Sequence, residues 1–104
     1  MDAHPGILFR DGPAGRRAVL IGGPDVWEVI RAIRDARATE PELPDDEVLG
    51  LVERNTGVAI TRSHIAIDYF GDLPDDIDAR CAQANVAERD LELAHQRTSE
   101  LLRA

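Results

Sequence analysis

The chain of 104 residues contains no lysine, a single cysteine and only four aromatic residues. The lone Cys81 excludes an internal disulfide, which is typical of proteins of the reducing cytoplasm, the expected location. No apolar run approaches the ~20 residues that a membrane-spanning helix needs, so we expect no membrane contact. Aliphatic side chains and alanine must therefore fill most of one modest core, and residues 1–104 are expected to form a single domain.

The formal charge of -8 is distributed unevenly along the chain. Residues 38–79 contain eleven acidic residues and only two arginines, whereas the segments on either side are close to neutral. Proteins that bind DNA draw much of their affinity from Lys and Arg placed on phosphates. The acidic middle of the chain therefore argues against a strong, stand-alone DNA-binding domain.

Two short apolar segments, Ile7–Arg10 and Ala18–Ile21, flank a stretch that is rich in turn-forming residues. Apolar segments separated by Gly and Pro are typical of a β-hairpin. We expect a hairpin over residues 7–21, with a loop of several residues between its strands.

Residues 24–37 have the spacing of apolar residues that an amphipathic helix requires. Pro24 suits the first turn of this helix, and Asp25 favours its N-terminus through the helix dipole. Basic residues recur every three positions, at Arg31, Arg34 and Arg37. This stripe either contacts a partner or simply solvates the outer face of the helix.

Residues 45–71 predict a helix-turn-helix. The first helix ends near Gly57, and the second begins at Thr61, whose hydroxyl can cap the first backbone N–H groups. Gly71 can adopt a left-handed C-terminal cap, and Pro74 prevents the second helix from continuing.

Residues 74–103 predict a long final helix. Small or apolar residues recur along it at alternating spacings of three and four, at Ala84, Ala87, Leu91, Ala94, Thr98 and Leu101. Such a seam faces a partner helix, supplied either by a second copy or by another protein. Because half of its positions are alanine, the seam permits close approach but offers little hydrophobic area.

Carboxylates cluster at Asp75, Asp76 and Asp78, a composition that could hold a divalent cation. At the start of a helix, however, these side chains fan outward and compensate the helix dipole. The three histidines lack metal-ligand spacing, and the glycine-rich segments lack the phosphate-loop pattern. We therefore expect no metal, no cofactor and no catalytic residue.

Two segments resemble the signatures of one bacterial family. The stretch YFGDLPDDIDAR, from Tyr69 to Arg80, resembles the Tyr-Tyr/Phe…Asp-Glu-Ile-Asp-Ala signature of the family catalogued as domain of unknown function 433. GRRAVLIGG followed by VWEVI at Val26–Ile30 resembles its Gly-Arg-Arg-Ile…Val-Trp-Glu-Val-Val pattern. The resemblance spans roughly Gly15 to Leu102, and the order of the elements agrees.

This resemblance implies a VapB-type antitoxin with a helix-turn-helix, whose partner is a PIN-like ribonuclease toxin that holds metal with clustered carboxylates. The last helix would then bind the toxin, and the expected partner-binding residues are Leu91, Ala94, Arg97, Leu101, Leu102 and Arg103. One of the two arginines could occupy the acidic site of the toxin.

Operator DNA is the other expected partner. The N-terminal end of the second helix of a helix-turn-helix enters the major groove. The expected DNA-binding residues are therefore Thr61, Arg62 and Ser63, with Arg16 and Arg17 of the hairpin adding backbone contacts.

The sequence thus predicts an α+β, mainly α fold: an N-terminal β-hairpin, a helical helix-turn-helix domain and a long C-terminal helix. The first functional hypothesis is an antitoxin that neutralises its toxin by direct binding and regulates its own operon as a homodimer. The alternatives are a stand-alone DNA-binding regulator and a dimerisation or scaffold module that does not bind DNA.

Overall fold

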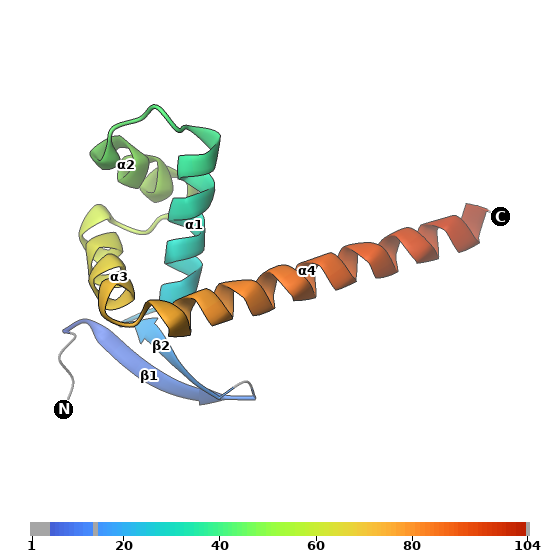
Figure 1. Ribbon diagram of the computed structural model, residues 1–104, viewed down its shortest axis with the longest axis horizontal. Helices are drawn as coiled ribbons and strands as arrows, with labels where there is room; N and C mark the ends of the chain where they lie inside the picture. Colours follow the sequence, from blue (N-terminus) through green and yellow to red (C-terminus); the bar gives the residue numbers. More distant parts are fainter. Residues whose placement is uncertain (1–4, 14, 104) are drawn as a thin grey trace.

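The computed structural model describes residues 5–13 and 15–103 of the chain. In that part a β-hairpin of β1 (Ile7–Gly12) and β2 (Gly15–Leu20) precedes the helices. These are α1 (Val26–Thr39), α2 (Asp45–Thr56), α3 (Ile60–Asp72) and α4 (Pro74–Arg103). Figure 1 shows the hairpin beneath α1 and α3, while α4 extends far out from the domain. The predicted fold class, a hairpin followed by helices and a long C-terminal helix, is confirmed.

The hairpin is tighter than the sequence predicts. Its strands pair antiparallel from Ile7 opposite Leu20 to Gly12 opposite Gly15, so positions 13 and 14 alone join them. Gly15 has a φ of 97°, in the left-handed region that favours glycine. The predicted loop of several residues is therefore wrong, because most of its residues continue the strand pairing. Ile21 lies just beyond β2 and is 58% exposed.

Helix α1 begins later and ends later than predicted. Asp25 is its N-cap, and the Asp25 N–H donates a hydrogen bond to the Glu28 carboxylate at 3.2 Å, as in a capping box. Pro24 precedes the cap and does not lie in the first turn. At the other end the helix continues to Thr39, two residues beyond the expected terminus at Arg37.

The turn between α2 and α3 corrects two predicted caps. Gly57 has a φ of 80°, and its N–H donates to the Glu53 carbonyl at 2.8 Å, closing the end of α2. Ala59 is the N-cap of α3, so Thr61 already lies inside the helix and is not its cap. Gly71 is likewise not a C-cap, because α3 continues past it with helical backbone.

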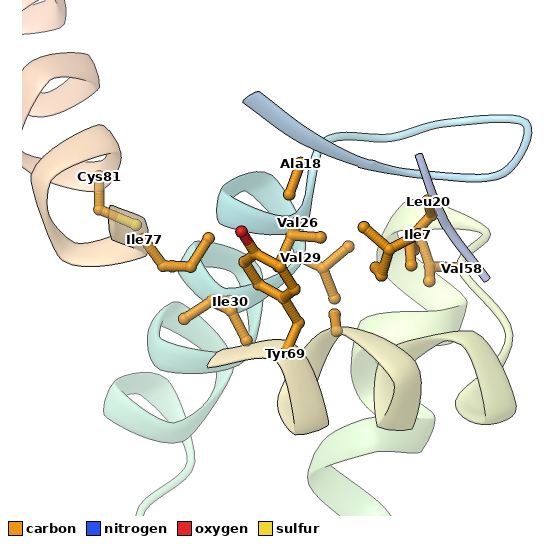
Figure 2. Packing of buried hydrophobic residues seen from close by; sticks show 11 residues of the cluster. Ile7, Ala18, Leu20, Val26, Val29, Ile30, Val58, Tyr69, Ile77 and Cys81 are labelled. Carbon is orange, nitrogen blue, oxygen red and sulfur yellow. The ribbon is translucent and has the colours of Figure 1, made fainter. Parts of the chain in front are cut away.

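The main core lies between the hairpin, α1, α3 and the first turns of α4, as Figure 2 shows. Its buried residues are Ile7, Ala18, Leu20, Val26, Val29, Ile30, Val58, Ala66, Tyr69, Ile77 and Cys81. The Phe9 and Tyr69 rings, whose centroids are 6.2 Å apart, tie the hairpin to α3. Ile77 and Cys81 are 2% and 6% exposed and anchor α4 by its first turns.

Helix α2 packs on the far end of α1 through a smaller cluster made by Ala36, Val48 and Val52. Arg37 reinforces this contact, because its guanidinium lies 2.7 Å from the Asp45 carboxylate and donates to the Leu43 carbonyl at 2.5 Å.

Among the described residues no helix has the length and apolar character needed to cross a bilayer.

Candidate functional site

Helix α4 leaves the domain soon after Cys81, and its free part consists of residues 89–103, beyond the Arg31–Glu88 pair. Ala84 is partly buried, and every residue from Asn85 to Thr98 is exposed. The leucines of this free segment are strongly exposed: Leu91 by 71%, Leu101 by 75% and Leu102 by 80%. Large apolar side chains thus project into water from a helix that Figure 1 shows standing clear of the rest of the molecule.

All six residues predicted to bind a partner are placed on this free part of α4 and are exposed. They do not all share one side of the helix. Arg97 and Leu101 are four residues apart and therefore neighbours on the helix surface. Arg103 projects about 160° away from Leu101, since each residue turns an α-helix by about 100°. Arg97 is therefore the arginine that lies on the same side of the helix as Leu101.

The arginine stripe of α1 has a structural role that neither sequence interpretation anticipated. Each member pairs with a carboxylate on a neighbouring helix, in the pairs Arg31–Glu88, Arg34–Asp78 and Arg37–Asp45. The hydrogen bond from Arg31 lowers the pKa of the Glu88 carboxyl. The stripe therefore joins α1 to both α2 and α4.

The residues predicted to contact DNA at the start of α3 do not form one accessible surface. Ser63 is fully buried, so its hydroxyl is excluded from any contact surface, contrary to the prediction. The Arg62 guanidinium donates to the Ile21 carbonyl at 2.7 Å and also to the Gly23 carbonyl. Arg62 therefore holds the β2–α1 turn against α3, and Thr61 is the exposed member of this trio.

The solvent side of α3 is acidic. Its exposed residues are Thr61, His64, Asp68, Gly71 and Asp72. Two of these are carboxylates and none is an arginine. Carboxylates repel the phosphates of a nucleic-acid backbone, so this side of α3 lacks the electrostatic basis of DNA binding.

The two hairpin arginines are engaged within the domain. The Arg16 guanidinium lies 4.2 Å from the centroid of the Phe9 ring, a cation–π contact. The Arg17 Nε lies 2.7 Å from the Asp25 carboxylate beside the start of α1. Neighbouring residues of a strand point to opposite faces, so the two side chains do not converge on one surface.

The acidic and sulfur-containing side chains near α4 are placed for structural roles. Asp75 and Asp76 lie in the first turn of α4, and Asp78 pairs with Arg34 at 2.7 Å. Within residues 5–13 and 15–103, no group of three or more His, Cys, Asp or Glu residues is placed to hold a metal ion. The Cys81 thiol packs in the core, and burial raises its pKa.

A surface hollow of about 700 Å³ lies between α1, α2 and α3. Its apolar lining residues are Ile33, Ala38, Val48, Leu49 and Ile67. The arginines that line it, Arg34 and Arg37, are both held by carboxylates. A ligand site needs a few polar groups that converge on one point, and those two are already engaged.

Comparison with protein-family models, curated proteins and solved structures finds no match for this chain. The resemblance to the antitoxin family therefore stays a prediction. Among the described residues, the most exposed large apolar side chains are those of Leu91, Leu101 and Leu102 on the free part of α4.

Proposed function

We propose that this protein is a non-enzymatic antitoxin that uses α4 to bind and block a nuclease toxin in the bacterial cytoplasm. The free part of α4 carries this proposal, because Leu91, Leu101 and Leu102 are strongly exposed there. A helix with an apolar face laid in the groove of another protein is a common mode of recognition. The exposed helix supports a protein partner, and the family resemblance supports a nuclease toxin as that partner.

The block is steric and electrostatic. Leu91 and Leu101 fill apolar pockets of the toxin groove, and Arg97, one turn from Leu101, reaches the carboxylates that hold the toxin's metal. Arginine suits this role because its planar guanidinium binds a carboxylate through two parallel hydrogen bonds. One antitoxin occupies one toxin site, without turnover.

We assign no DNA-binding role to the α2–α3 pair. The exposed side of α3 is acidic, and Arg62 is engaged by backbone carbonyls. A stand-alone regulator therefore lacks support from the surface it would use. A dimerisation module would use the same helix as an antitoxin. Binding of a toxin distinguishes these two candidate functions.

The test is co-expression with the product of the adjacent reading frame. We expect a stable stoichiometric complex and relief of the growth inhibition that the neighbour causes. Deleting residues 90–104 should abolish both effects and leave the domain folded, because the described residues beyond Glu88 make no hydrogen bond or ion pair with it. A harmless neighbour without a complex would overturn the proposal.

Paired substitutions locate the surface on α4. Leu91→Ala with Leu101→Ala should weaken the complex strongly, since each leucine buried in a groove removes a large apolar surface from water. The matched control is Arg89→Ala with Gln96→Ala, two exposed residues on the opposite side of the same helix. If the control weakens the complex and the leucine variant does not, the assigned face of α4 is wrong.

A further inference from the structure

The exposed residues of α4 also specify how two copies of this chain fit together. We infer that in the free protein α4 pairs antiparallel with α4 of a second copy, centred between positions 92 and 93. This pairing concerns the free protein and does not depend on a toxin. It uses the seam of residues that recur at alternating spacings, Ala84, Ala87, Leu91, Ala94, Thr98 and Leu101.

In this register each larger seam residue meets a small one. Leu91 lies opposite the partner's Ala94, and the two-fold axis repeats the contact in reverse. Likewise Thr98 lies opposite the partner's Ala87, and Leu101 lies opposite the partner's Ala84. Layers that alternate large and small side chains interdigitate closely, so the helices can approach without leaving voids.

The charges that flank the seam select the same register. Asp90 and Arg97 lie on one side of it, and Asp90 faces the partner's Arg97. Symmetry doubles this contact, which gives two Asp90–Arg97 pairs along one interface.

Other registers place like charges together. A shift of one heptad in one direction brings Arg97 opposite the partner's Arg97. The same shift in the other direction brings Asp90 opposite the partner's Asp90. Flanking charges of this kind set the partner and orientation of paired helices, so charge complementarity favours the single antiparallel register centred between positions 92 and 93.

A parallel pair loses both kinds of complementarity. It stacks Leu91 on the partner's Leu91 and Thr98 on the partner's Thr98, and it leaves alanine facing alanine. Arg97 then faces the partner's Leu102. A parallel pair also brings both domains, each in a chain of net charge -8, to the same end of the assembly.

The antiparallel pair matches the length of the free helix. From Ala84 to Leu101 the overlap is about 26 Å, at 1.5 Å of rise per residue. The partner's Leu101 then reaches Ala84, where α4 becomes partly buried against its own domain. The two domains then lie at opposite ends of the pair, and the pairing covers the exposed part of the seam.

Disulfide trapping tests the orientation with purified protein. In a Cys81→Ser background, one chain carries Ala87→Cys and a second chain of larger mass carries Thr98→Cys. We expect a mixed disulfide between the two chains and no self-linked product from either alone. Self-linked products would show parallel pairing, and the absence of any disulfide would show no pairing, so either result overturns the inference.

A charge exchange tests the register. Asp90→Arg should weaken self-association about tenfold in sedimentation equilibrium, because two attractive contacts become repulsive. Adding Arg97→Asp should restore it. Arg89→Asp, on the opposite side of α4, is the control and should leave it unchanged. An Asp90→Arg protein that associates normally, or no rescue by the second change, overturns the register. Because no toxin is present, these outcomes are separate from the toxin test.

Discussion

The Arg31 guanidinium on α1 donates a hydrogen bond to the Glu88 carboxylate on α4, 57 positions further along the chain. Within the described residues, this is the most C-terminal hydrogen bond or ion pair that joins α4 to the domain. The ten residues that follow, through Thr98, are all exposed. The pair therefore marks where α4 stops stabilising the domain and becomes free to bind.

Acid should loosen α4 at this boundary. The hydrogen bond from Arg31 lowers the pKa of Glu88 from its ordinary value of 4.5. A carboxylate with a lowered folded-state pKa stabilises the fold above its ordinary pKa, and this contribution is lost as the pH falls through the lowered value. We expect hydrogen-exchange protection of residues 84–88 to fall below about pH 4, after correction for intrinsic rates.

Glu88→Gln is the control for this pH effect. The amide side chain does not titrate, so the protection of residues 84–88 should already be reduced at neutral pH and should change less with acid. Identical pH profiles for the two proteins would show that Glu88 does not control the boundary.

Arg62→Ala should destabilise the domain. It removes the hydrogen bonds that Arg62 donates to the Ile21 and Gly23 carbonyls. A hydrogen bond to a charged group contributes about 1.5–3 kcal/mol, so we expect a loss in this range in urea unfolding. Arg89→Ala, on the free part of α4, should change the free energy of unfolding by less than about 0.5 kcal/mol. Equal effects of the two substitutions would contradict the assigned role.

Ser63→Ala should stabilise the protein slightly. The Ser63 hydroxyl is fully buried and has no hydrogen-bond partner among the described residues. A buried polar group without a partner costs about 1–3 kcal/mol, so its removal should raise the free energy of unfolding by up to about 1 kcal/mol, less the packing lost with the oxygen. The exposed Thr61→Ala serves as a control in the same thermal unfolding series. A clear destabilisation by Ser63→Ala would indicate that the hydroxyl has a partner.

Two glycine substitutions should act in opposite directions. Gly57 has a φ of 80°, and a Cβ there meets nothing within 4 Å, so Gly57→Ala carries the conformational cost alone, about 1–2 kcal/mol. Gly71 lies within α3, and a Cβ at that position also has open space around it. Gly71→Ala should therefore stabilise by about 0.5–1 kcal/mol through higher helix propensity. Loss of stability at Gly71 would contradict this expected gain from helix propensity.

The isolated protein should not bind duplex DNA at about 0.15 M salt, because the solvent side of α3 is acidic. Fluorescence anisotropy with the duplex upstream of its own reading frame measures this directly. Binding that weakens steeply as salt rises would show that another surface supplies the phosphate contacts.

The elements that follow from local patterns could be predicted. The spacing of apolar residues indicated the helices, and the glycine at position 57 indicated the turn before α3. The seam on α4 could be read from the sequence because it depends on helical spacing alone. Its exposure follows from the fold, since the domain ends before Leu91.

The missed features depend on contacts between distant segments. Ser63 shares its helical face with Ala66 and Tyr69, a three-residue spacing that could have indicated burial, but its hydroxyl suggested a surface role. The partners of Arg62 are backbone carbonyls of a turn, which no side-chain pattern identifies. The arginine stripe of α1 pairs with carboxylates that only the tertiary fold brings near.

Helix α4 runs without interruption from Pro74 to Arg103, so the packing of Ile77 in the core fixes the azimuth at which the distant leucines point. One residue inserted after Arg89 would turn every later side chain by about 100° and carry Leu91 and Leu101 off their face. An insertion of seven residues would nearly restore their direction while moving them about 10 Å outward. The rotational phase of α4, as much as its composition, therefore specifies what this protein can bind.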